Sequence, residues 1–174
     1  ASAAAMAAAA AESGAPFMIA QVLRFWPEYV AIGKAWRSGE LGEEVMASAV
    51  RLSQLPAWAD WYKDPELSGG GALDIHAHDI DILVHLFGRV REVHAVGWKN
   101  SRGAWNHVVS NLVFEHGTRA VAEGSIEITA GYPFTMGLRL VGTRATLDFH
   151  LQAGANLDEM VDNPTTLWKY QAGA

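Results

Sequence analysis

The order of hydrophobic and polar positions predicts helices in the first part of the chain. Ala1 to Ser13 is nearly all alanine and predicts a helix that ends at Gly14. Pro27 to Ser38 predicts a second helix, because proline suits the first helical position. Between them, Phe17 to Leu23 is an apolar run of strand length, and Glu44 to Ser53 alternates in the manner of a strand. Helices therefore precede most of the predicted strands.

The last third of the chain predicts one strand after another. Two short connections, Glu115 to Gly117 and Gly142 to Arg144, have the length of tight hairpin turns. Consecutive hairpins make a predominantly antiparallel sheet with the helices on one face, so the predicted fold class is α+β. The strands are apolar enough for the other face to need a cover, and we expect oligomerisation there. The predicted strands are Val90 to Lys99, His107 to Phe114, Thr118 to Thr129, Phe134 to Val141 and Ala145 to Leu151.

A stretch rich in histidine and aspartate, from Ser68 to Gly88, lies between these two parts. It predicts one helix that a run of glycines opens and a glycine ends. Four ionisable side chains share one stripe of this helix, within about 40° of the first, because spacings of three and four residues return to one face. They are Asp74, His78, Asp81 and His85. Apolar residues fill most of the circumference, so the stripe faces a cleft, a partner or a narrow exposed edge.

The stripe has a structural and a functional interpretation. A solvated helix edge usually carries Lys, Arg and Gln, but none of these occurs between Asp64 and Gly88. Gly69 to Gly71 leave backbone amides open to a ligand at the positive end of the helix dipole. Both details favour function. Asp74 and His78, one turn apart, suit an acid–base pair, whereas all four side chains together suit a divalent metal; the spacing does not separate these alternatives.

Composition and charge narrow the class of protein. The 174 residues suffice for one domain, and 50% hydrophobic with 18% charged residues describes a folded chain. A net charge of −6 without a Lys/Arg cluster argues against nucleic acid or an anionic membrane as partner. The absence of cysteine excludes disulfides and thiol chemistry. It does not indicate the redox compartment. The sequence has no transmembrane run, and we expect a cytoplasmic protein that binds a small molecule or another protein.

An aromatic loop precedes the central helix. Gln54 to Gly71 lacks helical or strand periodicity but contains Trp58, Trp61 and Tyr62, which is too aromatic for an inert connection. The loop either forms a wall over a site or is anchored by these rings. The sequence leaves both alternatives open.

The order of the motifs resembles a known family. The runs FMIAQVLRFWP, SGGGALDIHAHDIDILVHLFG, VREVHAVG and LRLVGTRATLDF resemble the C-terminal domain of the Gfo/Idh/MocA oxidoreductases, relatives of glucose–fructose oxidoreductase and inositol dehydrogenase. The resemblance covers about Ala1 to Phe149. It depends on the combination of RF before Pro, GGG-x-x-D-x-x-x-H-x-x-D, and GT before the last hairpin strand.

The resemblance implies roles for individual residues. The family joins a Rossmann domain that binds NAD or NADP to an α+β domain that contacts substrate and forms the oligomer interface. Asp74 and His78 match the family's D-x-x-x-H motif, in which the histidine is the acid/base on a substrate hydroxyl. Arg24 matches the arginine of the RF motif, and the region from Arg51 to Trp58 lies where relatives contact substrate. The implied catalytic residues are His78 and Asp74, and the implied substrate contacts are Arg24, Arg51, Trp58 and Trp61.

Two family motifs are missing. No G-x-G-x-x-G follows a strand, and the family's Glu-Lys-Pro motif does not occur. We therefore expect residues 1–174 to be one substrate-binding and oligomerisation domain, with residues 1–14 a remnant of the junction to an absent Rossmann domain. Such a chain alone would bind no cofactor and would be inactive. The alternatives are a stand-alone binding or scaffold domain and, with less support, a metal site on the four stripe residues.

Overall fold

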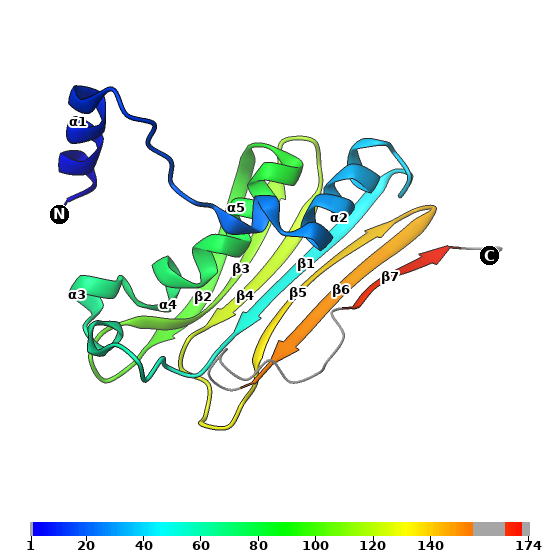
Figure 1. Ribbon diagram of the computed structural model, residues 1–174. Coiled ribbons are helices and arrows are strands. Elements are labelled where there is room, and N and C mark those ends of the chain that lie inside the picture. The colour runs from blue at the N-terminus through cyan, green and yellow to red at the C-terminus, as the bar shows by residue number, and fades with distance from the viewer. Residues whose placement is uncertain (1, 155–165, 172–174) are drawn as a thin grey trace.

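In the part of the chain that the structure describes, the fold is a seven-stranded sheet with helices on one face (Figure 1). A computed structural model describes residues 2–154 and 166–171. The strand order is β2-β3-β4-β1-β5-β6-β7, and every neighbouring pair is antiparallel except β1 and β4. The predicted α+β class with a mostly antiparallel sheet is confirmed. The strands are β1 Glu44–Leu52, β2 Val90–Lys99, β3 Trp105–Phe114, β4 Arg119–Ser125, β5 Phe134–Gly142, β6 Ala145–Ala153 and β7 Thr166–Gln171.

Both predicted hairpins are present. Phe114 and Thr118 close the turn between β3 and β4, and Gly117 within it has a φ of +96°, which favours glycine. The second hairpin joins β5 to β6 through Thr143 and Arg144. The strand predicted from Thr118 to Thr129 is shorter in the structure, where β4 ends at Ser125. The last strand, β7, was not predicted.

The helices follow the chain in the predicted order but not with all the predicted bounds. The first helix, α1, has the side chain of Ser2 as its N-cap and ends at Gly14, whose φ is +64°. The apolar run from Phe17 to Leu23 joins no strand; it leads instead into a short 3₁₀ helix, and Phe17 is 52% exposed. The helical elements are α1 Ala3–Ser13, η1 Val22–Phe25, α2 Pro27–Arg37, η2 Asp60–Lys63, α3 Pro65–Ser68, α4 Gly70–Asp74 and α5 His76–Phe87.

The prediction of one continuous helix from the glycine run to Gly88 is wrong. The chain breaks after Asp74, so α4 and α5 are separate helices. At the start of α4, Gly71 lies against β3, and an added Cβ would be 3.0 Å from the Asn106 carbonyl oxygen. The amide of Gly71 donates to Asn106 Oδ1 at 2.9 Å. This amide is therefore used in packing and is not open to a ligand.

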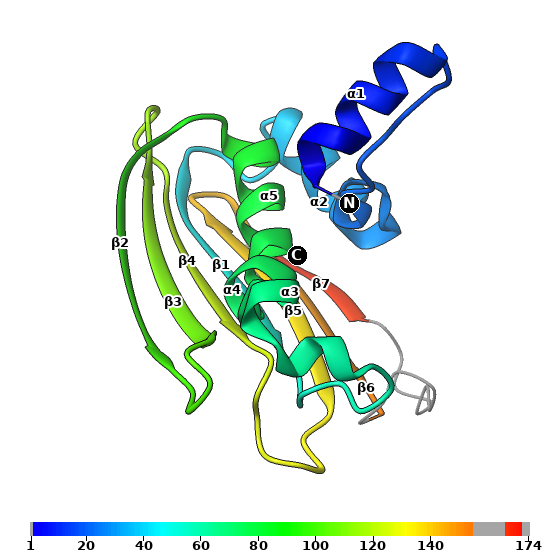
Figure 2. The same cartoon turned by 90° about the vertical axis from the view of Figure 1, so that its left-hand side faces the viewer.

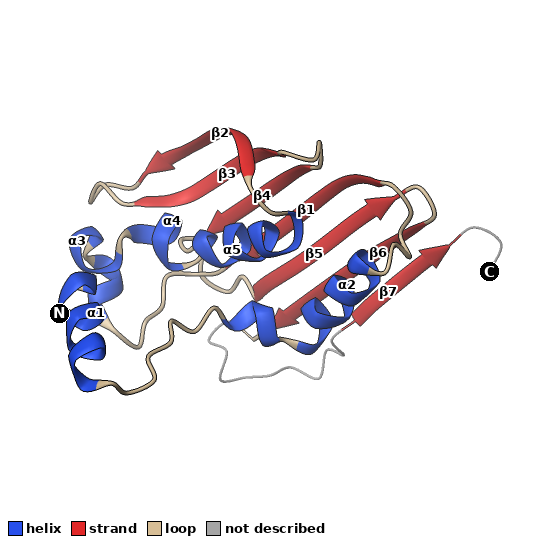
Figure 3. Ribbon diagram, turned by 90° about the horizontal axis from the view of Figure 1, so that it is seen from above, coloured by secondary structure: helices blue, strands red, loops and turns tan. Residues whose placement is uncertain are grey.

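The core lies between the helices and one face of the sheet. Figures 2 and 3 show α2 and α5 over that face, while the opposite face has no helix in the described part of the chain. Tyr29 meets Phe149 edge to face at 5.2 Å, and Phe87 meets Phe114 at 5.3 Å. Such pairs add to the stabilisation from burial. This packing holds α5 and its polar residues against the centre of the sheet.

Candidate functional site

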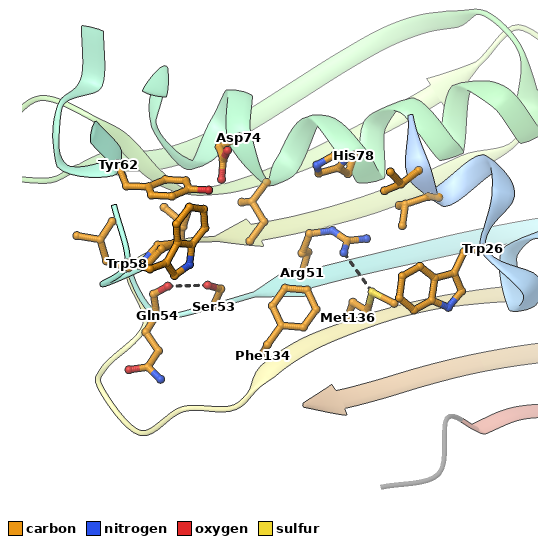
Figure 4. A pocket seen from close by; sticks show the side chains of 16 residues that line it. Trp26, Arg51, Ser53, Gln54, Trp58, Tyr62, Asp74, His78, Phe134 and Met136 are labelled. Atoms are coloured by element: carbon orange, nitrogen blue, oxygen red, sulfur yellow. Dashed lines mark hydrogen bonds between the residues drawn. The ribbon is translucent and has the colours of Figure 1, made fainter. Parts of the chain in front are cut away.

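A cavity of about 340 Å³ opens where the α4–α5 junction meets the end of β1. Its polar lining includes Arg51, Ser53, Tyr62, Asp74 and His78. Aromatic rings and a thioether make up much of the rest, from Trp26, Trp58, Phe134 and Met136 (Figure 4). An apolar cleft with a few convergent polar groups is the usual form of a small-molecule site.

Asp74 and His78 line the same cavity, as the acid–base interpretation requires. Asp74 is the last residue of α4, and His78 lies in the first turns of α5. Both are half-buried. Burial raises the pKa of Asp74, and the nearby His78 lowers it by a smaller amount. A carboxyl group and an imidazole on one cavity wall are the side-chain types used in proton transfer.

Arg51 and Asp79 form a buried ion pair beneath the cavity. The guanidinium Nε donates to Asp79 Oδ2 at 2.9 Å, and Nη2 donates to Oδ1 at 3.0 Å. The side chains are 6% and 0% exposed. Burial raises the pKa of Asp79, and the bound guanidinium opposes this effect by stabilising the carboxylate. The pair joins α5 to β1 and thereby fixes the helix that carries His78.

Aromatic rings from the loop after β1 form a wall of the cavity. Trp58 meets Tyr62 edge to face at 4.9 Å, and Trp61 stacks on Tyr62 at 3.8 Å. Trp58 and Tyr62 line the cavity, whereas Trp61 lies behind Tyr62 and does not line it. Trp58 is 67% exposed. The exposure favours the wall interpretation over hydrophobic anchoring.

The remaining stripe residues do not reach the cavity. Asp81 accepts from Arg24 Nε at 2.8 Å and from Nη2 at 2.5 Å, so this pair ties η1 to α5. Arg24 itself is not among the residues that line the cavity. His85 is exposed and lies in a separate hollow with Trp36. Within the described residues, no group of three or more His, Cys, Asp or Glu side chains is placed to hold a metal ion.

Sequence reasoning missed two buried polar residues of α5. Asp79 is one, and His76 is the other: its Nε2 lies 2.8 Å from Ser110 Oγ, and burial lowers its pKa. Both residues lie on the helix face that carries the buried Ile82 and Leu83, because spacings of three, four and seven residues return to one face. A polar residue at such a position is the signal that could have revealed them.

Comparisons with known proteins identify the family of the chain. A family model described as the GFO/IDH/MocA C-terminal domain matches residues 29–148. An oxidoreductase from Formosa agariphila is 29% identical over 108 residues, which are 58% of this chain and 34% of that protein. The predicted family resemblance is confirmed.

Solved structures show the same fold. The WlbA dehydrogenase from Bordetella pertussis, in complex with NADH and UDP-GlcNAcA, matches 90% of this chain and 48% of its own with a TM-score of 0.69 and 20% identity. The UDP-N-acetylglucosamine 3-dehydrogenase GnnA from Acidithiobacillus ferrooxidans matches 98% and 48% with a TM-score of 0.65 and 19% identity. The chain thus spans about a third of the curated relative and about half of each solved chain. No helix in residues 2–154 or 166–171 is long and apolar enough to cross a membrane.

Proposed function

Because this chain belongs to the Gfo/Idh/MocA C-terminal domain family, we propose that it is the substrate-binding domain of an NAD(P)-dependent dehydrogenase that acts on a sugar, polyol or related hydroxyl compound. The observation that carries the proposal is the presence of Asp74 and His78 together on the wall of an aromatic-lined cavity. Aromatic faces suit the C–H faces of a sugar ring, and the two ionisable groups suit its hydroxyls.

His78 is the proposed general base. Oxidation of an alcohol to a carbonyl removes the hydroxyl proton and a hydride from the same carbon, and the imidazole accepts the proton. Asp74, on the same cavity wall, is the proposed orienting residue for the imidazole. The bound nicotinamide supplies the chemistry of hydride acceptance. In the reverse direction, protonated His78 returns the proton to the developing alkoxide.

The dinucleotide is proposed to bind to a Rossmann half outside this chain. The glycine run at the start of α4 is unsuited to a phosphate, because Gly70 and Gly71 are buried against Asn106 and its neighbours. A phosphate loop needs glycines whose amides face the ligand. Alone, the chain would lack its cofactor and would not turn over substrate.

The helix-free face of the sheet is proposed as the contact between copies of the enzyme. Large apolar side chains on this face are between 38% and 62% exposed. They are Met46, Val96, Trp98, Val141, Trp168 and Tyr170. Exposed apolar surface of this kind is typical of an interface. Sedimentation velocity tests the proposal: Trp98→Asp with Trp168→Asp should shift the enzyme to smaller species.

The test of the dehydrogenase proposal is His78→Ala in the complete enzyme that contains this domain. Turnover should fall by about 10²- to 10⁴-fold, which is the usual contribution of a general base, while the thermal midpoint changes little. His85→Ala is the matched control, because His85 lies on the same helix but outside the cavity. If His78→Ala turns over substrate as fast as the wild type, His78 is not the general base. A wild-type enzyme that binds no dinucleotide would favour the alternative of a binding or scaffold domain.

A further inference from the structure

The guanidinium of Arg51 has one nitrogen that the ion pair does not use. Nε and Nη2 donate to Asp79, and Nη2 also lies 3.5 Å from the Tyr29 hydroxyl. The remaining nitrogen, Nη1, donates to the sulfur of Met136 at 3.2 Å. A thioether is a weak acceptor for a charged N–H donor. Nη1 therefore retains capacity to donate to a stronger acceptor, an oxygen.

The residue that carries this nitrogen lines the cavity. Arg51 and Met136 both line it, and Figure 4 shows the guanidinium beneath His78 with Met136 and Phe134 beside it. Arg51 as a whole is 5% exposed, so bulk water does not readily satisfy the donor. A buried polar group without a good partner is costly. A ligand oxygen that reaches Nη1 would remove this cost.

The charges around the cavity decide which kind of oxygen fits. Arg51 is the lining residue with a fixed positive charge, and Asp79 neutralises it at 2.9 Å. Asp74 adds a carboxylate to the lining. A second arginine, Arg24, is outside the lining and is itself paired with Asp81. The described residues therefore offer a hydrogen-bond donor without an excess of positive charge.

We infer that the cavity selects uncharged hydroxyl compounds over the corresponding carboxylic acids, with Arg51 Nη1 as the donor to one substrate hydroxyl and Asp79 as the residue that sets the preference. The inference rests on the proposed function and names the charge class of its substrate. A hydroxyl accepts from Nη1 and still has a proton to donate. A carboxylate at the same place has no proton to donate, and its attraction to Arg51 is offset by repulsion from Asp79 and Asp74.

The experiment measures the preference in the complete enzyme. The probes are glucose with glucuronate, galactose with galacturonate, and mannose with mannuronate, each tested with NAD and with NADP. The wild-type kcat/KM should favour the neutral member of a pair by at least about tenfold, equivalent to one charge–charge interaction of modest strength. Asp79→Asn keeps the shape and one acceptor oxygen but removes the neutralising charge. It should move the ratio toward the acid by about tenfold or more.

Glu115→Gln is the matched control. Glu115 pairs with Arg89 at 3.3 Å, and both side chains are exposed and lie outside the cavity lining. Its ratio should equal that of the wild type. If Asp79→Asn does not fold, calorimetric binding to Asp74→Asn replaces it, and the ratio of dissociation constants should move in the same direction.

The outcomes separate the inference from the proposed function. An acid preferred by the wild type, or a ratio unchanged in folded Asp79→Asn, would overturn the inference while leaving the dehydrogenase proposal in place. Turnover of none of the six probes with either cofactor would overturn the proposal of a sugar dehydrogenase, and the inference with it.

Discussion

Two arginine–aspartate pairs fasten α5, and they differ in burial more than in geometry. Each arginine donates to both oxygens of its aspartate, between 2.5 and 3.0 Å. The Arg51 and Asp79 side chains are 6% and 0% exposed, whereas those of Arg24 and Asp81 are 39% and 17% exposed. The aspartates are two residues apart, so one points to the sheet and the other points away from it. The same chemical pair therefore occurs in two dielectric environments.

Burial changes what each pair can do. Removing two charges from water costs several kcal/mol per ion, so the buried pair holds α5 in place only while both partners are present. The exposed pair remains largely solvated and contributes little to stability. Only the buried pair borders the cavity, through Arg51. Removing one partner should therefore destabilise the protein more at the inner pair than at the outer pair.

The largest expected effect comes from breaking the inner pair. Asp79→Ala leaves the Arg51 charge buried without its partner, so the free energy of unfolding should fall by about 3–5 kcal/mol. Urea denaturation followed by circular dichroism measures the loss. A loss as small as that of an exposed ion pair would show that water or a neighbouring group compensates Arg51, and the comparison between the two pairs would fail.

Replacing both inner residues sharpens the comparison. Arg51→Met with Asp79→Leu removes both charges and keeps apolar volume, so the double variant should be more stable than Asp79→Ala alone. The same denaturation experiment tests this. The double variant should nevertheless bind the substrate more weakly, because the donor to the proposed hydroxyl is gone. Recovered stability with unchanged substrate affinity would contradict the assigned role of Arg51.

The parts of the fold that depend on local sequence could be predicted. The helix from Ala3 has a capping serine and a terminal glycine, and the turn at Gly117 has the length that a hairpin needs. These signals act over a few residues, so the sequence shows them directly. The apolar run from Phe17 also has a local pattern, but it joins no strand of the sheet, and Phe17, Met18 and Ile19 are exposed while Leu23 is buried. A pattern alone does not reveal which edge or surface a segment meets.

The candidate site could be predicted only in part. The spacing of Asp74 and His78 placed both on one cavity wall, but the position of α4 against the sheet involves a contact between Gly71 and Asn106, which lies on β3. The role of Asp79 depends on Arg51, which is 28 residues away in sequence. A helical wheel contains neither contact. Long-range packing therefore decided which stripe residues face the cavity.

The buried His76 on α5 should make the free energy of unfolding depend on pH. We expect this effect to be smaller than the destabilisation from breaking the inner ion pair. Burial lowers the pKa of His76 below its ordinary value of 6.5, so the unfolded chain binds more protons than the folded chain just below that pH. Stability should therefore fall as the pH drops below about 6.5 toward the folded-state pKa. His76→Gln should reduce this slope between pH 7 and 5. His85→Gln, on the exposed part of the same helix, should leave it unchanged; equal slopes in all three proteins would exclude His76 as the cause.

The smallest expected effect comes from breaking the outer pair. Arg24→Ala should leave the unfolding midpoint close to that of the wild type, because Arg24 is exposed and salt screens its attraction to Asp81. Thermal unfolding at low and high salt measures the difference, which should shrink as salt rises. A local effect is still expected: η1 should exchange its backbone amides faster, since the Arg24–Asp81 pair is one of the contacts that hold η1 to α5. Trp26 follows η1 and lines the cavity, so substrate affinity should fall more than stability. A large, salt-independent loss of stability would mean that the outer pair behaves like the inner one, and that burial is not what distinguishes them.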